Sequence, residues 1–263
     1  MRKGDEVGAM SLMGLEIVRL HGSWWAQGEA RLGLAGAITA LFAGLGYAVH
    51  GVNRSGAVAG AVVCFALFAA AGPGAFVALL TLFIVTWIAT RVGRSKKQRL
   101  GTAERGEGRS ASQVLANLGA AALCAVLYAA RGEAWWLLVS AAAMAEAAAD
   151  TVSSELGQAF SRRALLITSF ETVPPGTDGG ISIRGTASGV LAACVMSAVC
   201  VGTGMIPMRW GSIAAASGVC GMLVDSLLGA SLERGGFVGN DLVNFASTVV
   251  AAVLGGLGAS FLS

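Results

Sequence analysis

Several carboxylates occupy positions where an apolar chain seldom holds a charge. Five of them stand in or at the ends of apolar runs: Glu146, Asp150, Glu155, Asp225 and Asp241. An ionised carboxylate in hydrocarbon is costly, so such residues are usually functional or paired. Oxygen ligands without histidine suit Mg²⁺, which binds one or two carboxylates together with substrate phosphates. We therefore predict a Mg²⁺ site with four of them as ligands: Asp150, Glu155, Asp225 and Asp241.

A second group of residues has the composition of a phosphate-binding loop. Residues 173–186 read Val-Pro-Pro-Gly-Thr-Asp-Gly-Gly-Ile-Ser-Ile-Arg-Gly-Thr, and a helix is expected to begin near Thr186. Backbone N–H groups of such a turn, at a helix N-terminus, form an anion site. The predicted phosphate-binding residues are Gly176, Thr177, Gly179, Gly180, Ser182 and Thr186. The alternative is a simple turn, since the Gly-Lys-Ser/Thr of a P-loop is missing.

Basic residues supply the opposite charge. Seven Lys and Arg residues lie between positions 91 and 109. Together with the loop, three of them are expected to hold phosphate: Arg91, Lys96 and Lys97. Three amides are expected to orient phosphates: Asn117, Asn240 and Asn244. The alternative is that the basic run is a solvated loop that only fixes topology, while the acids pair with arginines at helix ends.

A protein nucleophile is missing from this set. Both His residues lie in the first fifth of the chain and all five Cys lie in apolar runs, which disfavours Ser–His–Asp hydrolysis. Phosphoryl transfer onto an acceptor that is already a phosphate needs no protein nucleophile. The second pKa of such an acceptor is about 6, so its oxygen is anionic near neutral pH. Positioning and charge neutralisation then suffice.

Membrane-spanning helices must position these residues. Of 263 residues, 55% are hydrophobic and 13% charged, with a mean hydropathy of +0.71, whereas soluble domains have roughly 25% charged residues. This composition excludes an ordinary soluble enzyme, a disordered protein and a nucleic-acid binder. Apolar runs of about 20 residues can cross a bilayer, and eight are predicted to do so: 32–49, 56–72, 74–90, 112–130, 135–157, 186–203, 211–230 and 241–261. The expected fold is an all-α polytopic integral membrane protein with about eight transmembrane helices.

The expected organisation is a single transmembrane helical domain over residues 31–263, preceded by an N-terminal interfacial amphipathic segment over residues 1–30. Loops rich in Lys and Arg remain in the cytoplasm, which predicts cytoplasmic loops at 91–111 and 158–185 in a bacterial inner membrane. The acidic residues are expected near the same face. A homo-oligomer is left open, as is a crossing by residues 10–28.

Seven segments resemble a known integral membrane family. In order along the chain they are Ser55–Gly60, Thr90–Lys97, Gln113–Asn117, Ala149–Gly157, Pro175–Thr186, Gly221–Ala230 and Asn240–Phe245. The combination of Asp-Thr-x-Ser-Ser-Glu-x-Gly with Gly-Thr-Asp-Gly-Gly is the most specific part. The family contains plant phytyl-phosphate kinase and mammalian transmembrane protein 19, and its pattern is similar to CTP-dependent polyprenol kinases.

This resemblance implies a Mg²⁺-dependent kinase that moves the γ-phosphoryl group of CTP, or another nucleoside triphosphate, onto an isoprenyl phosphate lipid. It carries over Asp150, Ser154, Glu155, Thr177, Asp178, Ser182, Asp225, Asn240 and Asn244. The catalytic residues are then expected to be Asp150, Glu155, Asp178 and Lys97. The expected partners are the lipid substrate, the nucleotide and membrane lipid, with no nucleic acid.

A transporter or flippase of a phosphorylated isoprenoid lipid is the alternative. A carrier needs polar groups through the whole bilayer, and here they gather near one face. Glu146 is the deepest of them and the residue that favours the transporter.

Overall fold

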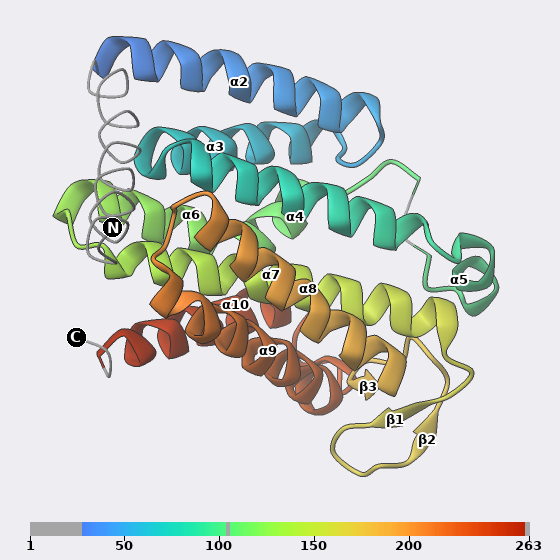
Figure 1. The fold of residues 1–263 in the computed structure, drawn as a ribbon. Helices are drawn as coiled ribbons and strands as arrows, with labels where there is room; N and C mark the ends of the chain where they lie inside the picture. The colour runs from blue at the N-terminus through green and yellow to red at the C-terminus, as the bar shows by residue number, and fades with distance from the viewer. Residues whose placement is uncertain (1–27, 104–105, 261–263) are drawn as a thin grey trace, which may run out of the picture.

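A bundle of long helices makes up the protein (Figure 1). The computed structural model describes residues 28–103 and 106–260. Over these ranges the long helices are α2 (Gly28–Ala48), α3 (Arg54–Ala71), α4 (Pro73–Arg91), α6 (Ala111–Arg131), α7 (Trp135–Phe160), α8 (Ile183–Gly202), α9 (Gly211–Leu228) and α10 (Asn240–Ser260). They match the eight predicted spans, and the all-α membrane fold is confirmed. Residues 1–27, most of the predicted interfacial segment, lie outside the described ranges.

Seven of these helices are long and apolar enough to cross a membrane. The eighth is α7, which carries Glu146, Asp150 and Glu155 along its 26 residues. Charged residues lower the hydropathy of this helix, but its neighbours cover it. Helices α4, α6, α8, α9 and α10 all pack against α7, and nearly every residue from Leu138 to Val152 is buried.

Small residues allow the helices to approach α7 closely. The stretch of α7 from Ala141 to Ala149 consists mostly of alanine, and glycines on α8, α9 and α10 face it. A Cβ atom on Gly189 would lie 2.8 Å from the carbonyl oxygen of Ala149, and one on Gly218 would lie 2.8 Å from the Cβ of Ala145. Close contact through small residues is the usual way helices pack in lipid.

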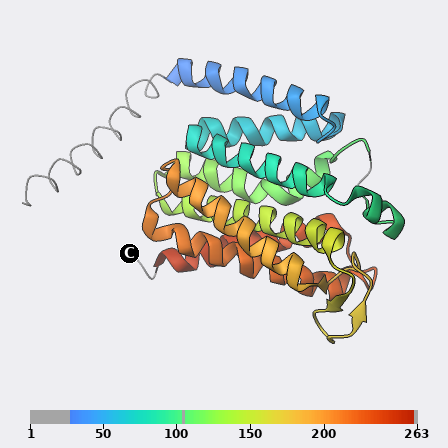
Figure 2. The same ribbon diagram turned by 45° about the vertical axis from the view of Figure 1, so that its right-hand side comes forward.

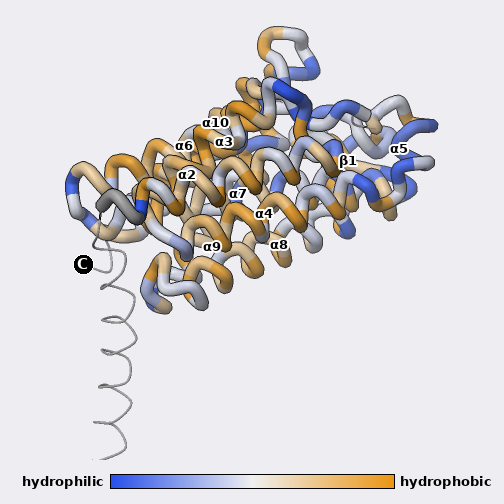
Figure 3. The backbone as a smooth tube through the Cα atoms, turned by 90° about the horizontal axis from the view of Figure 1, so that it is seen from above, coloured by the Kyte–Doolittle hydropathy of each residue, from blue (hydrophilic) through white to orange (hydrophobic). Residues whose placement is uncertain are grey.

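The two ends of the bundle differ in composition. One end carries the short helix α5 (Arg94–Leu100) and a small antiparallel sheet, and hydrophilic residues gather there (Figures 1 and 3). The sheet has the order β2-β1-β3, formed by β2 (Thr172–Val173), β1 (Ala164–Leu166) and β3 (Gly180–Ile181). We call this end, with residues 49–53, 92–103, 106–110, 161–182 and 229–239, the polar end.

Helix α2 lies at the outer edge of the bundle against α3 (Figure 2). A 3₁₀ turn (Met208–Trp210) precedes α9, and a π-helical turn η2 (Gly229–Glu233) follows it. Three details differ from the expected fold. Helix α5 and the sheet form inside segments expected to be loops, and α8 begins at Ile183 instead of near Thr186. The earlier start has a local cause, because the Ser182 side chain accepts a hydrogen bond from the Gly185 N–H and caps the helix.

Candidate functional site

A pocket at the polar end gathers acidic residues from distant parts of the chain. It has a volume of about 110 Å³ and lies between α7, the 164–182 segment, the end of α9, η2 and the start of α10. Four carboxylates line it: Asp150, Asp178, Asp225 and Glu233. We call it the acidic pocket. No Lys or Arg of the described ranges lines it.

The central pair in this pocket is Asp150 on α7 and Asp225 on α9. Their side chains lie within hydrogen-bonding reach of each other. Ser247 on α10 donates its hydroxyl to Asp225 Oδ2 at 3.2 Å and so fixes one of the two carboxylates. Two carboxylates this close repel each other when both are ionised, and a cation between them removes this repulsion. The pair is therefore suited to bind a cation.

Below this pair lies Glu146, one helical turn before Asp150 on α7. It is 1% exposed, and its Oε1 atom has no hydrogen-bond partner among the described residues. Gly221 on α9 makes room for it, because a Cβ there would lie 2.5 Å from Glu146 Cγ. The carboxylates thus form a column that runs from the polar end into the bundle.

The glycine-rich segment folds over the pocket opening. Residues Pro175 to Ser182 all line the acidic pocket. Gly179 has φ +72°, and a Cβ at this position would lie 2.3 Å from the Cβ of Ala230, so both the backbone conformation and the packing require glycine. The hydroxyls are already engaged: Thr177 donates to the carbonyl of Pro174, and Ser182 caps α8. Two backbone N–H groups of the loop are engaged as well, because that of Thr177 donates to the carbonyl of Pro174 and that of Gly180 to the carbonyl of Thr177. The N–H groups of Gly176, Asp178 and Gly179 remain as the phosphate-binding candidates.

The donor set of the acidic pocket fits Mg²⁺ shared with a substrate. Among the described residues, no three His, Cys, Asp or Glu side chains lie close enough to hold a metal by themselves. Mg²⁺ seldom uses an all-protein cage, and commonly takes one or two carboxylates, with waters and phosphate oxygens completing the shell. Asp150 and Asp225 provide two such carboxylates side by side. The residues therefore fit a Mg²⁺ ion that arrives with a phosphate ligand.

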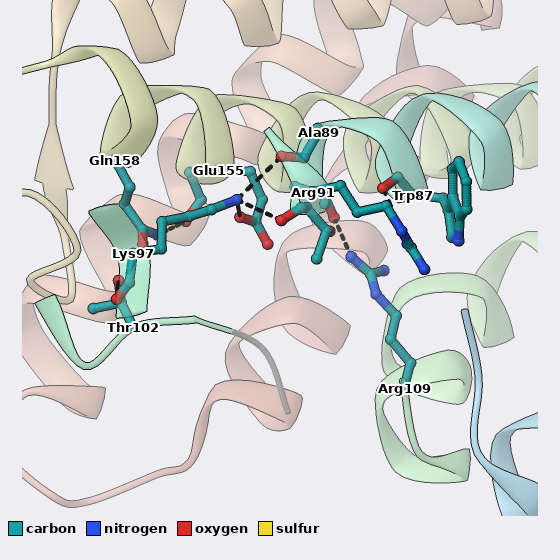
Figure 4. A network of polar contacts seen from close by, with 11 residues as sticks. Trp87, Ala89, Arg91, Lys97, Thr102, Arg109, Glu155 and Gln158 are labelled. Atoms are coloured by element: carbon teal, nitrogen blue, oxygen red, sulfur yellow. Dashed lines mark hydrogen bonds and ion pairs between the residues drawn. The ribbon is translucent and has the colours of Figure 1, made fainter. Parts of the chain in front are cut away.

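Two predicted catalytic residues are engaged with each other outside this pocket. Lys97 on α5 is 1% exposed, and its Nζ lies 2.5 Å from Glu155 Oε2 on α7. The same ammonium donates to the carbonyls of Ala89 and Thr90 at 3.1 and 2.6 Å (Figure 4). Neither residue lines the acidic pocket. Glu155, expected to bind metal, and Lys97, expected to bind phosphate, thus form an ion pair with each other, and both roles stay predictions.

The other predicted cations do not line the acidic pocket either. Lys96 Nζ donates to the carbonyls of Ala159 and Ser161 at 3.3 and 2.5 Å, at the end of α7. A cation is favoured there because the last carbonyls of a helix lack partners. Arg91, together with Asn117, lines a different and largely apolar cavity.

Some of the remaining predicted residues line the acidic pocket and others do not. Ser154, Gly176, Thr177, Gly179, Gly180, Ser182 and Asn240 line the acidic pocket with Asp150, Asp178 and Asp225. Thr186, Asp241 and Asn244 do not. Sequence reasoning missed Glu233, which lies eight residues after Asp225, in the loop expected between the spans 211–230 and 241–261. Its neighbour is Arg234, so its sequence context is that of an ordinary charged loop.

Comparison with known proteins places this architecture in a family. The pattern of the integral membrane protein family DUF92 matches residues 37–252, which is most of the chain. The match includes every residue that lines the acidic pocket. The chain belongs to the DUF92 family. The resemblance of the seven segments to an integral membrane family is therefore confirmed. No solved structure matches the chain significantly.

Relatives of this DUF92 protein occur in archaea, cyanobacteria and plants. It is 35% identical to an uncharacterized membrane protein of Methanocaldococcus jannaschii, over 78% of this chain and 84% of the relative. It is 30% identical to an uncharacterized membrane protein of Synechocystis, over 72% of this chain and 75% of the relative. It is also similar to Protein VTE6, chloroplastic, of Arabidopsis thaliana, with 29% identity over 78% of this chain and 65% of that protein.

Proposed function

We propose that this protein is a Mg²⁺-dependent kinase of isoprenyl monophosphates. It would transfer the γ-phosphoryl group of CTP, or of another nucleoside triphosphate, to the lipid phosphate and form the diphosphate. The observation that carries the proposal is the acidic pocket, where Asp150 and Asp225 meet the glycine-rich loop at the polar end of a membrane-spanning bundle. The family resemblance, which includes plant phytyl-phosphate kinase, supports the same reaction class.

In the proposed reaction, an oxygen of the lipid phosphate attacks the γ-phosphorus of the nucleotide. A new P–O–P bond forms, and the bond from the γ-phosphorus to the β–γ bridging oxygen breaks, so that the nucleoside diphosphate leaves. Asp150 and Asp225 would hold Mg²⁺, and the N–H groups of the 176–182 loop would contact nucleotide phosphates. When bound, Mg²⁺ would supply positive charge that offsets the negative charge of the phosphates.

We further propose that the polar end faces the cytoplasm of a bacterial inner membrane. Basic residues of loops are retained on the cytoplasmic side, and α5 with its flanking loops carries the densest run of them. Nucleotide and Mg²⁺ are then available on the side where the acidic pocket opens.

The direct test uses purified full-length protein in nanodiscs with Mg²⁺, geranylgeranyl monophosphate and γ-labelled CTP. We expect label in geranylgeranyl diphosphate, detected by chromatography and mass spectrometry. The Glu171→Gln variant is the control, because Glu171 is exposed and lies outside the acidic pocket. Absence of a labelled diphosphate with ATP, GTP, UTP and CTP, and with acceptors of several chain lengths, would refute the kinase.

A transporter of phosphorylated isoprenoids is the second candidate, and Glu146 is the observation that favours it. A carboxylate that is 1% exposed in the middle of the bundle could serve ion-coupled transport. Proteoliposomes with a fluorescent isoprenyl monophosphate in one leaflet distinguish the two. Protein-dependent flipping without nucleotide, lost in Glu146→Gln, would support the carrier, and diphosphate formation without flipping would support the kinase.

A further inference from the structure

A second cavity has a different character from the acidic pocket. It has a volume of about 270 Å³ and lies between α2, α3, α4, α6 and the loop before α6. Its walls are mostly apolar, with Phe42, Val63, Leu79, Leu82 and Phe83 among the lining residues. Ligand pockets are usually apolar in this way, with a few polar groups that fix the orientation of the ligand.

Positive charge is concentrated at one end of this cavity. Arg91, Arg94 and Arg109 line it where α4 ends and α6 is about to begin, which is at the polar end. In the described part of the chain no carboxylate lines the cavity. We call it the arginine cavity. Arginine is well suited to phosphate because its planar donors can form paired charge-assisted hydrogen bonds.

The depth of the arginine cavity suits an extended hydrocarbon chain. Arg91 and Leu79 both line it and lie twelve residues apart on α4. At 1.5 Å per residue this corresponds to about 18 Å along the helix. The hydrocarbon core of a bilayer is about 30 Å thick. The cavity therefore extends from the charged surface into the membrane. A lipid with one polar head and one hydrocarbon chain would extend over the same depth.

Two of the three arginines, Arg91 and Arg109, are held in position by the groups around them. The guanidinium of Arg91 stacks over the Trp87 ring at 3.8 Å, and its Nη2 donates to the carbonyl of Val49 at 2.7 Å. The backbone of Arg109 pairs with the loop before α3, because its N–H donates to Gly51 and its carbonyl accepts from Asn53. Positively charged groups fixed in advance lose little freedom when an anion binds.

One side chain connects this cavity with the acidic pocket. Arg109 lines the arginine cavity, and its Nη2 donates to Thr151 Oγ1 at 3.3 Å (Figure 4). Thr151 directly follows Asp150, and the charges of Arg109 and Asp150 act on each other. A phosphate held at Arg109 is therefore next to the residue that would hold the nucleotide's metal ion.

We propose that the arginine cavity is the binding site of the acceptor lipid. The isoprenyl chain lies along α4 between the apolar walls, and the monophosphate contacts Arg91, Arg94 and Arg109 at the polar end. This inference rests on the proposed kinase function, and it adds a lipid site that is separate from the nucleotide site.

A cavity-filling variant tests the tail site without touching the arginines. Gly60 on α3 lines the cavity, and a Cβ there would meet nothing within 4 Å, so Gly60→Leu places a side chain in open space. Gly119→Leu on α6 is the matched control, because Gly119 has equally open surroundings and does not line the cavity. Arg94→Gln removes one head-group charge from an exposed residue.

The measurement is the binding of geranylgeranyl monophosphate to full-length protein in detergent, followed by native mass spectrometry without nucleotide. We expect Gly60→Leu to weaken binding about tenfold or more, which is about 1.4 kcal/mol, and Gly119→Leu to bind as the wild type does. Arg94→Gln should weaken the monophosphate about tenfold and leave the affinity for geranylgeraniol unchanged.

Two outcomes overturn the proposal. One is wild-type lipid affinity in both Gly60→Leu and Arg94→Gln. The other is equal competition by geranylgeraniol or phosphatidic acid, which would make the cavity a general lipid site. Failure of the kinase is distinguishable: the monophosphate would then bind in the cavity as expected, while no diphosphate would form when nucleotide is added.

Discussion

The acidic pocket and the arginine cavity lie at the same end of the bundle and carry opposite charges. The first is lined by four carboxylates with no Lys or Arg from the described ranges, and the second by three arginines with no carboxylate from them. They share no lining residue. Helix α7 supplies Asp150 to one, and Thr151 contacts Arg109 of the other.

This division indicates how two phosphate compounds could be kept apart and yet brought together. A nucleotide that carries Mg²⁺ suits carboxylates, and a lipid phosphate without a metal suits arginines. Negative charge on both substrates would otherwise push them apart. In our account, each pocket balances the charge of one substrate, and Arg109 stands between them.

The largest expected effect is that of Asp150→Asn, which changes a residue of the acidic pocket and none that lines the arginine cavity. Loss of one ligand charge should lower turnover about a thousandfold, as loss of a group that stabilises transferring charge commonly does. The affinity for geranylgeranyl monophosphate should not fall, because the variant removes a negative charge that acts on Arg109. Initial rates and lipid binding measured on the same preparation check both parts, and turnover that equals the wild type would remove Asp150 from the site.

Breaking the Lys97–Glu155 pair should affect stability more than chemistry. Glu155→Gln leaves the ammonium of Lys97 buried with two carbonyls and no counter-charge, which should cost about 3 kcal/mol of stability. Thermal unfolding in detergent measures this, with Glu171→Gln as the control. The family resemblance predicts instead that Glu155 is a catalytic metal ligand, and lost turnover with unchanged unfolding temperature would favour that role.

The smallest expected effect is that of Ser247→Ala. This change removes one hydrogen bond to Asp225, worth about 1 kcal/mol, and should weaken Mg²⁺–nucleotide binding about fivefold. Lipid binding should be unaffected. Ser188→Ala is the matched control, because its hydroxyl bonds only its own helix, at the carbonyl of Arg184. Equal nucleotide affinity in both variants would show that Ser247 does not orient Asp225.

Sequence reasoning predicted the helices well because long apolar runs of this kind form helices in a lipid bilayer. It also placed Asp150, Asp225 and the glycine-rich loop near one membrane face, because the distribution of basic residues predicts which helix ends lie on the same side of the membrane. It could not tell on which side of α7 each residue would lie. Arg91, Lys96 and Lys97 share the polar end with the loop, but they contact Trp87, the end of α7 and Glu155 respectively.

The small elements at the polar end were beyond the sequence patterns for a similar reason. Strands of two or three residues, such as β2 and β3, are too short for an alternating pattern. Their formation depends on pairing with β1, and helix α5 depends on contact with α7. The start of α8 depends on the cap at Ser182, so the helix begins three residues before the predicted position.

Simultaneous occupancy of both pockets is the most direct test of the account. Native mass spectrometry of the full-length protein with Mg²⁺, a non-hydrolysable CTP analogue and geranylgeranyl monophosphate measures it. We predict a complex with one nucleotide and one lipid, from which Gly60→Leu loses only the lipid and Asp150→Asn only the nucleotide. Displacement of one ligand by the other, or loss of both ligands in either variant, would contradict two separate sites.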